Sequence, residues 1–291
     1  MGITFGLIDK LRDCDVFAAP GCSVLDIGSS NLYQADVEQV QRFLRHFRAA
    51  DLDADLHTFA ERLAAGSHYD PVSGGTNDVF AGELLERCGM QYLSFDIADG
   101  YKTRIFDLNS DSLDPKHRGA FDVVLNIGTT EHLINQLNAF DVIHDAVKPG
   151  GYIVHQLPVA GFTDHGYFLY TGRMFFDMAS FNNYDIADLW YEGPAGDDDV
   201  YQSVRSYAHY FPKLKMLPTP EVKVPNCAIT IIFRKTGTGP FKPCLETSTS
   251  VGNIPSAVKL RYAGGLVAKA TKVARGKGLG YLLRRVFGRT E

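Results

Sequence analysis

Apolar residues in this chain occur in two patterns, short continuous runs and stripes spaced three or four residues apart, and the two alternate along its length. Both patterns stand side by side after residue 120. The β-branched apolar run at 121–127, which Gly128 ends, predicts a buried strand. Within 133–147 apolar residues recur at helical spacing and predict an amphipathic helix. These residues are Leu133, Leu137, Phe140, Ile143 and Val147.

A turn and a second apolar run follow the predicted helix. Lys148 suits the negative end of a helix, Pro149 cannot continue one, and the glycines at 150–151 permit a sharp turn. The run at 152–157 then predicts another strand. Because strands joined by a helical crossover pair in parallel, this order predicts an α/β fold with a doubly wound, mostly parallel sheet. Its functional site is expected at the carboxyl ends of the strands.

The same two patterns recur on both sides of this stretch. Further strands are predicted at 23–27, 91–96, 103–109, 184–191 and 228–234, and further helices at 5–12, 37–47, 52–63, 77–88, 172–181 and 200–210. The helical segments within 32–76 predict an insertion after the first strand. We expect three parts, which are an N-terminal lead-in over 1–20, one α/β domain over 21–238, and a linker with a basic tail over 239–291.

Charge is distributed unevenly along the chain. The net charge is -5, yet from Pro255 onward nine Lys or Arg residues stand against the single acid Glu291, so this tail carries +8 and the remainder -13. The acidic body argues against a general nucleic-acid binder. For the tail, the sequence leaves two possibilities open, weak contact with an anionic membrane surface or acidic partner, and a solvated extension.

The cysteines and the first residues of the chain indicate the cellular compartment. The five cysteines are scattered, odd in number and never spaced as C-x-x-C, which predicts neither a disulfide framework nor a cysteine zinc site. The first residues lack the apolar core of a signal peptide, and no stretch has the length of a membrane span. These features together predict a cytoplasmic protein.

Small and acidic residues stand at the ends of the predicted strands. Gly28, Ser29 and Ser30 follow the first strand, where small residues let backbone N–H groups approach a ligand, although they also serve any tight turn. Asp96 ends the second strand, where a nucleotide ribose needs an acceptor. Asp107 ends the third and is a candidate acceptor for an exocyclic amine. Asp96 follows Gly28 at more than the usual interval of about 20 residues, which the insertion explains.

Histidines provide the candidate general bases, because their ordinary pKa of about 6.5 lies near neutral pH. His132 and His165 follow the fourth and fifth strands, whereas His144 and His155 are expected to be structural. His165 is a candidate for catalysis or substrate contact, or a loop residue that binds nothing. Glu131 is expected to orient His132, to bind substrate, or to cap the following helix. The lack of H-x-x-x-H spacing predicts no metal site.

Five segments in fixed order carry a family resemblance. They are VLDIGSSN (24–31), YLSFD (92–96), IFDLN (105–109), FDVVLNIGTTEHL (121–133) and KPGGYIVHQLP (148–158). Together they resemble the class I S-adenosylmethionine-dependent methyltransferases over about residues 21–235. The resemblance implies a Rossmann-like sheet of seven strands whose last two form an antiparallel hairpin. The chain departs from the family in its first turn, where only one of the usual two or three glycines remains.

The resemblance also implies a cofactor, S-adenosylmethionine. The leading hypothesis is methyl transfer to an oxygen of a small-molecule acceptor, such as a sugar or another polar metabolite. The implied cofactor-binding residues are Asp26 at the amine, Gly28 and Ser29 at the methionine part, Asp96 at the ribose, Asp107 and Leu108 at the adenine, and Asn126 to Gly128 along the reacting centre. The implied catalytic residues are Glu131, His132 and His165. Two alternatives stay open, a non-catalytic Rossmann-like binding module with a lapsed cofactor site and a nicotinamide-dependent oxidoreductase.

Overall fold

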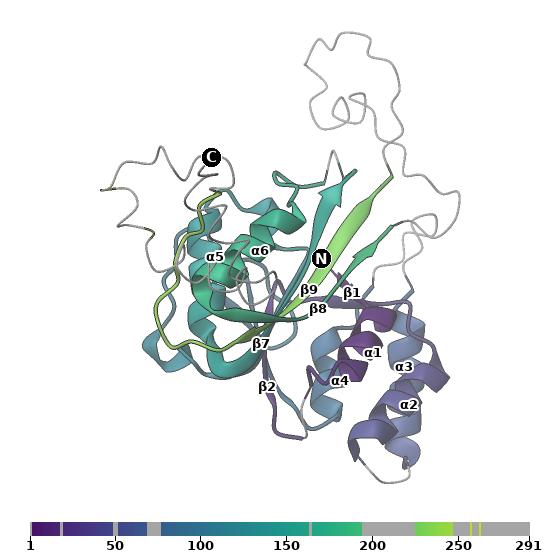
Figure 1. Ribbon diagram of the computed structural model, residues 1–291. Helices are drawn as coiled ribbons and strands as arrows, with labels where there is room; N and C mark the ends of the chain where they lie inside the picture. Colours follow the sequence, from purple (N-terminus) through teal and green to yellow (C-terminus); the bar gives the residue numbers. More distant parts are fainter. Residues whose placement is uncertain are drawn as a thin grey trace, which may run out of the picture.

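A seven-stranded sheet forms the centre of the molecule (Figure 1). The computed structural model describes residues 2–17, 20–48, 52–68, 77–162, 165–193 and 225–246, together with Ala257 and Tyr262. The strand order is β5-β4-β2-β6-β7-β9-β8. The strands are β2 (Ser23–Ile27), β4 (Gln91–Asp96), β5 (Thr103–Ile105), β6 (Phe121–Ile127), β7 (Val147–Ala160), β8 (Tyr184–Glu192) and β9 (Cys227–Lys235). Only β9 runs antiparallel to its neighbours, so the predicted doubly wound sheet with a terminal hairpin is confirmed.

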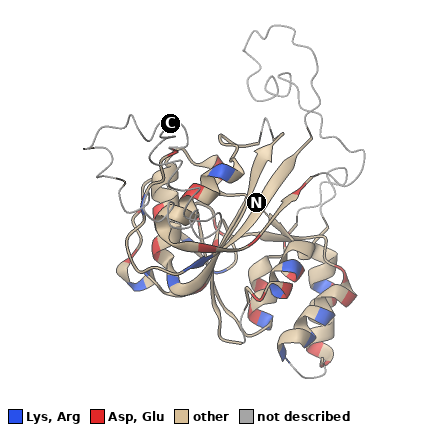
Figure 2. Cartoon of the chain, in the orientation of Figure 1, with Lys and Arg blue, Asp and Glu red and all other residues tan. Residues whose placement is uncertain are grey.

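Helices cover both faces of this sheet. One face packs against α1 (Phe5–Asp13), α2 (Val37–Arg48), α3 (Ala54–Gly66) and α4 (Ala81–Arg87), and the other against α5 (Gln136–Ala146) and α6 (Gly172–Asn182) (Figure 1). Side chains alternate between the two cores, as in β6, where Val123 and Leu125 belong to the first core and Val124 to the second. Charges of both signs are mixed along α1–α4, whereas the strands carry few (Figure 2).

The first residues of the chain join the segment that follows β2. Strand β1 (Gly2–Thr4) pairs in parallel with β3 (Asn31–Tyr33) to form a second, two-stranded sheet that the sequence did not predict. The side chain of Thr4 caps α1 by accepting the Leu7 N–H. The Phe5 ring of α1 then meets the Phe43 ring of α2 edge-on, with centroids 5.9 Å apart. The lead-in and the helices of the predicted insertion therefore share one core.

The helix after β6 begins later than predicted. Helix α5 starts at Gln136, because the Asn135 side chain caps it by accepting the Asn138 N–H. Residues Thr130–His132 form a separate 3-10 turn. The predicted stripe is wrong at Leu137, whose side chain is 57% exposed. The face that α5 buries comprises Ala139, Phe140, Val142, Ile143, His144 and Ala146.

Other predictions end differently or fall outside the described residues. The strand predicted at 103–109 stops at Ile105, because Asp107 begins a turn instead of continuing the ladder. The predicted helix at 200–210 and almost all of the basic tail lie outside the described residues. Within the described part of the chain, no helix has the length and apolar character to cross a membrane. The three-part division of the chain stays a prediction.

Candidate active site

The turn after β2 has an unusual backbone. Gly28 and Ser29 both have positive φ angles, 114° and 37°, and the Gly28 N–H donates to the Phe95 carbonyl at 2.8 Å. A positive φ angle is unfavourable for serine, and it persists only where surrounding contacts stabilise it. The Ser29 hydroxyl accepts hydrogen bonds from the Tyr101 N–H at 3.2 Å and the Thr103 hydroxyl at 3.0 Å. The predicted glycine-poor turn is therefore fixed by its serine.

Asp26 lies completely buried beneath this turn. Its Oδ2 accepts the Ser30 N–H and the Tyr92 hydroxyl, both at 2.7 Å, and its Oδ1 accepts the Ser30 hydroxyl at 3.1 Å. Burial raises the pKa of Asp26, the hydrogen bonds from Ser30 and Tyr92 oppose the rise, and the nearby Asp96 carboxylate adds to it. The structure thus gives Asp26 the task of holding the turn. Its expected contact with a cofactor amine stays a prediction.

Asp96 stands at the end of β4 with a free oxygen. Its Oδ1 accepts the Ala98 N–H at 3.0 Å, and its Oδ2 has no hydrogen-bond partner among the described residues. Ile27 of β2 is paired with Phe95 on one side and with Asn126 on the other. The ends of β4, β2 and β6 therefore meet at one edge of the sheet, where the chain order reverses direction, as expected for a ligand site of this fold.

The residues that follow β5 form a turn. The two carboxylate oxygens of Asp107 accept the Asn109 N–H at 2.8 Å and the Ser110 hydroxyl at 2.9 Å. The backbone hydrogen bond from Asn109 is the first cause of a lowered pKa for Asp107. Leu108 is buried in the core on the α5 side. A carboxylate oxygen has room for a second donor, so the adenine contacts of Asp107 and Leu108 stay predictions.

The side chain of Asn126 is part of a buried polar network. Its amide nitrogen donates to the Thr130 hydroxyl at 3.0 Å and lies 2.9 Å from His155 Nδ1. Tyr170 extends the network by donating to Gln136 Oε1 at 2.6 Å. Burial lowers the pKa of His155 to about 3, so this histidine is neutral, and its predicted interior role is confirmed. The network fixes the turn after β6, and a contact of 126–128 with the reacting centre stays a prediction.

Glu131 points into the protein. Its side chain is only 2% exposed and its Oε2 is buried without a hydrogen-bond partner in the described part of the chain. The predicted capping role is wrong, because Asn135 caps α5 and Glu131 belongs to the preceding 3-10 turn. A Cβ on Gly128 would lie 3.5 Å from Glu131 Oε1. Burial raises the pKa of Glu131 to about 7, because an ionised carboxylate is poorly solvated inside the protein.

The structure brings the three predicted catalytic residues together. Glu131 Oε1 lies 4.0 Å from His132 Nε2 and 3.9 Å from His165 Nε2. The two imidazole rings meet at 67° with centroids 4.8 Å apart. Burial, followed by the proximity of His165, lowers the pKa of His132. The histidines are partly exposed, 35% for His132 and 49% for His165, so the cluster opens to solvent on their side.

The loop after β7 is tied to Glu131 by backbone contacts. The Glu131 carbonyl accepts the Tyr167 N–H at 2.7 Å and the Phe168 N–H at 3.2 Å. A Cβ at Gly166 would come within 2.8 Å of Glu131 Cγ, a distance that side chains do not tolerate. The close contact with Glu131 therefore explains the glycine in the sequence His-Gly-Tyr-Phe, because only glycine lets His165 lie beside Glu131.

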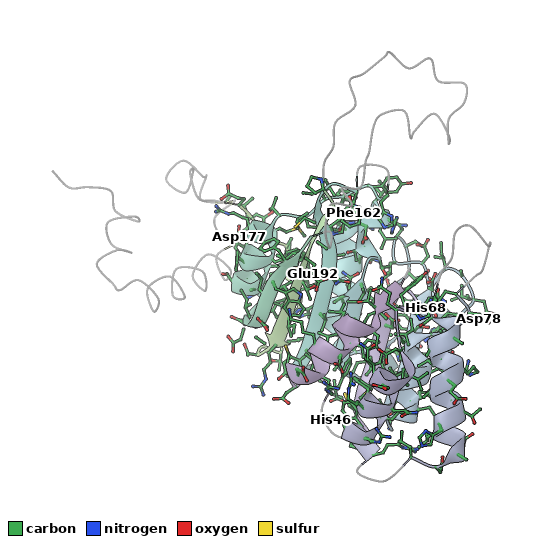
Figure 3. The ribbon with its side chains drawn as sticks, turned by 90° about the vertical axis from the view of Figure 1, so that its right-hand side faces the viewer. His46, His68, Asp78, Phe162, Asp177 and Glu192 are labelled. Carbon is green, nitrogen blue, oxygen red and sulfur yellow. The ribbon has the colours of Figure 1, made fainter. Side chains whose placement is uncertain are left out.

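A second tie fixes the start of the same loop. Phe162, labelled in Figure 3, has a positive φ of 47°, and its N–H donates to Asn226 Oδ1 at 2.7 Å. The Phe162 carbonyl then accepts the His165 N–H at 3.1 Å. Asn226 precedes β9 and was not singled out from the sequence. A lone asparagine before an apolar run carries no signal that would identify this contact.

A charged groove lies between α3 and α4, apart from this cluster. Its cavity volume is about 450 Å³, and its lining includes Tyr101 but none of the three predicted catalytic residues. Its charges are largely paired with one another, as Arg62 is with Glu83 and Arg87 with Asp55. We therefore place the candidate active site at the sheet edge, where the polar groups have unused capacity.

The sequence matches a family model described as a methyltransferase domain over residues 44–210, more than half of the chain. This protein belongs to that methyltransferase family, and the predicted resemblance to the class I S-adenosylmethionine-dependent enzymes is confirmed. The family assignment argues against the nicotinamide oxidoreductase that the sequence left open. The sequence matches no curated protein.

Several solved structures are similar in outline. The 1,6-didemethyltoxoflavin-N1-methyltransferase of Burkholderia thailandensis is 12% identical, with a TM-score of 0.39 and coverage of 80% of this chain and 76% of that one. The YcgJ protein of Bacillus subtilis is 12% identical, with a TM-score of 0.39 and coverage of 80% and 98%. The geranyl diphosphate C-methyltransferase of Streptomyces coelicolor is 11% identical, with a TM-score of 0.36 and coverage of 79% and 77%.

Proposed function

We propose that this protein transfers a methyl group from S-adenosylmethionine to an oxygen of a small-molecule acceptor, such as a sugar or another polar metabolite. The observation that carries the proposal is the meeting of Glu131, His132 and His165 at the edge of the sheet where a methyltransferase fold binds its ligands. The family assignment supports the reaction class. The geometry of the three side chains supports the choice of oxygen.

The residues at the sheet edge fit the cofactor. Asp96 Oδ2, which is unused within the described residues, is available to a ribose hydroxyl, and the Gly28–Ser29 turn brings backbone close to the same edge. The bound cofactor supplies an electrophilic methyl group on a sulfonium. The protein is then left to position the acceptor in line and to manage its proton. Two similar structures contain S-adenosylhomocysteine, the product of such a reaction.

The basic cluster favours a hydroxyl acceptor. In the transfer the acceptor oxygen bonds to the methyl carbon, the carbon–sulfur bond breaks, and its electron pair stays on sulfur. A hydroxyl must also lose its proton, whereas a neutral amine already has a free electron pair. Glu131, His132 and His165 place three basic groups at one point, and the two histidines face solvent. This arrangement suits an acceptor that must be bound and deprotonated.

Calorimetric titration of the full chain with S-adenosylmethionine and with NAD tests the cofactor. We expect binding of S-adenosylmethionine only. Binding of NAD alone would support an oxidoreductase, and binding of neither would support a non-catalytic module. Incubation with isotope-labelled S-adenosylmethionine and fractionated metabolites, followed by mass spectrometry, identifies the acceptor. Glu131→Gln should abolish labelling that His46→Asn, a change on the exposed side of α2, leaves unaltered.

We also propose that the protein works in the cytoplasm and that its basic tail makes weak contact with an anionic membrane surface or an acidic partner. Basic residues contribute about 1 kcal/mol each close to such a surface. Co-sedimentation with anionic liposomes at low and high salt tests the membrane contact. If removal of residues 255–291 leaves co-sedimentation unchanged, the tail has no part in it.

A further inference from the structure

The ligand atoms of Glu131, His132 and His165 lie close together without hydrogen bonding to one another. All three atoms lie within 4.8 Å of one another. The separations from Glu131 Oε1 to the two imidazole nitrogens, 4.0 Å and 3.9 Å, are too long for hydrogen bonds. We propose that these three side chains bind one divalent transition-metal ion, which in turn holds the acceptor hydroxyl.

The distances are close to those of a metal site. Nitrogen and oxygen ligands lie about 2.1 Å from zinc, so two ligands of a tetrahedral ion are about 3.4 Å apart. Closing the observed 3.9 Å and 4.0 Å gaps requires movements of about half an ångström, and closing the separation between the two histidine nitrogens, which is at most 4.8 Å, requires up to about 1.4 Å. His132 and His165 are both partly exposed, so rotation of the two rings can supply these movements while the buried Glu131 stays in place.

The buried carboxylate of Glu131 forms no ion pair with a lysine or arginine of the described residues. Glu131 Oε2 is fully buried and has no hydrogen-bond partner in the described part of the chain. Its partners within 4.0 Å are His132 and His165, which carry a charge only when protonated. An unpaired buried carboxylate is costly, and a cation at the centre of the cluster would remove that cost.

The surrounding backbone holds the ligands in their places. The carbonyl of Glu131 binds the N–H groups of Tyr167 and Phe168, and Gly166 permits the close approach that brings His165 to Glu131. The ligand cluster is therefore built by contacts between two loops that are far apart in the sequence. Fixed placement of this kind is typical of metal sites, whose ligands are oriented by the residues around them.

The ligand set indicates the kind of ion. Two imidazoles with one carboxylate suit Zn²⁺, Fe²⁺, Co²⁺ or Mn²⁺ better than Mg²⁺, which prefers oxygen ligands. Three protein ligands leave positions open for a substrate oxygen. This role rests on the proposed function, since a cation beside the acceptor hydroxyl makes loss of its proton easier. Because the three side chains are then ligands, the ion and not a free histidine promotes loss of the proton. The proton passes to solvent, and the bonds made and broken are those of the methyl transfer.

Titration with Co²⁺ tests the site directly. The full-length protein is stripped with a chelator, dialysed and titrated with Co²⁺ in a calorimeter and a spectrophotometer, without cofactor or acceptor. We expect one ion per chain for the wild type and at least tenfold weaker binding for Glu131→Gln, His132→Asn and His165→Asn. His46→Asn, at the opposite end of the molecule from Phe162 in Figure 3, is the matched control and should bind normally. No binding by the wild type, or equal binding by all variants, would overturn the proposal.

Replacing one metal-binding side chain with another distinguishes loss of the metal site from unfolding of the protein. His165→Cys keeps a metal ligand, so its Co²⁺ complex should gain a thiolate-to-metal absorption band that the wild type lacks. Absence of this band in a folded, cobalt-binding His165→Cys protein would show that residue 165 is not a ligand. Circular dichroism of each variant establishes that it is folded.

The same chelator-treated protein distinguishes failure of the metal site from failure of the proposed methyl transfer. Methyl transfer that proceeds at full rate in chelator-treated protein would refute the metal and leave the methyltransferase intact. Binding of Co²⁺ together with failure to bind S-adenosylmethionine would leave the metal site standing and refute the proposed reaction.

Discussion

Gly166 lies against Glu131 so closely that a Cβ at Gly166 would stand 2.8 Å from Glu131 Cγ and 3.0 Å from the Glu131 carbonyl oxygen. Glu131 is buried and its carbonyl is held by two N–H groups, so it has little freedom to move away. Any side chain at Gly166 must therefore displace the loop that carries His165. This single contact determines whether the three predicted catalytic residues stand together.

Gly166→Ala should damage the site more than the fold. We expect the free energy of unfolding to fall by about 1–3 kcal/mol through overpacking. Methyl transfer should fall about tenfold to a hundredfold, because His165 moves by a fraction of an ångström or more. Urea unfolding and steady-state rates measure the two effects. Gly6→Ala is the control, since a Cβ on this exposed helical glycine meets nothing within 4 Å, and normal rates for Gly166→Ala would contradict the argument.

Asp96→Asn should weaken binding of S-adenosylmethionine about tenfold to a hundredfold. The reason is the loss of a charge-assisted hydrogen bond worth about 1.5–3 kcal/mol. Calorimetric titration gives the dissociation constant. Asp99→Asn removes the same charge three residues further on, in a turn where Asp99 accepts the Gly100 N–H. Equal weakening by both variants would mean that general electrostatics, and not a contact of Asp96, is responsible.

Asp26→Asn should destabilise the protein by about 3 kcal/mol, because an amide group would face three donors that now point at a carboxylate. Tyr92→Phe removes one of those donors and should cost only about 1 kcal/mol. Urea unfolding measures both. If Asp26→Asn folds with undiminished stability but no longer binds S-adenosylmethionine, the carboxylate contacts the cofactor directly and does not merely hold the turn.

His144 should make the protein less stable in mild acid. It is buried between the Tyr184 hydroxyl and the Gly239 carbonyl, which confirms its predicted structural role. Burial lowers its pKa to about 4, and the nearby Lys235 contributes to the lowering. The unfolded chain takes up the proton near pH 6.5, whereas the folded protein resists it until about pH 4, so stability is lost as the pH falls through this interval.

Between pH 7 and pH 5 the loss due to His144 should be about 2 kcal/mol. His144→Gln, which does not titrate, should reduce the difference in unfolding free energy between these two pH values by about that amount. Urea unfolding at both pH values provides the comparison. An unchanged difference would show that His144 is not the group responsible.

The central strands were predictable from the sequence because each combines an apolar run with a clear boundary. Residues 23–27, 91–96 and 121–127 were predicted with the observed limits, since glycine or a polar residue closes each run. Strands β1 and β3 were missed, because three residues are too few to show a period and their pairing depends on tertiary contact. Leu137 was misassigned because it lies in the first turn of α5, where its side chain is exposed although its spacing matches the buried stripe.

The candidate site was predictable in its members but not in its arrangement. Glu131, His132 and His165 were chosen from their residue types and their positions after strands. Their meeting at 3.9–4.0 Å depends on Gly166, on the Glu131 carbonyl and on Asn226, and no local pattern predicts such contacts between loops. The capping role of Glu131 was wrong for a local reason, because Asn135 caps α5 and Glu131 lies in the preceding 3-10 turn.

The pairing of β1 with β3 has a practical consequence for anyone who shortens this chain. An expression product that starts at β2 would lose Phe5 and the strand partner of Leu32, although every residue of the seven-stranded sheet would remain. The apolar side of α2 and a bare strand edge would then face water. Such a surface promotes self-association, so a trimmed product should precipitate even though its sheet is whole.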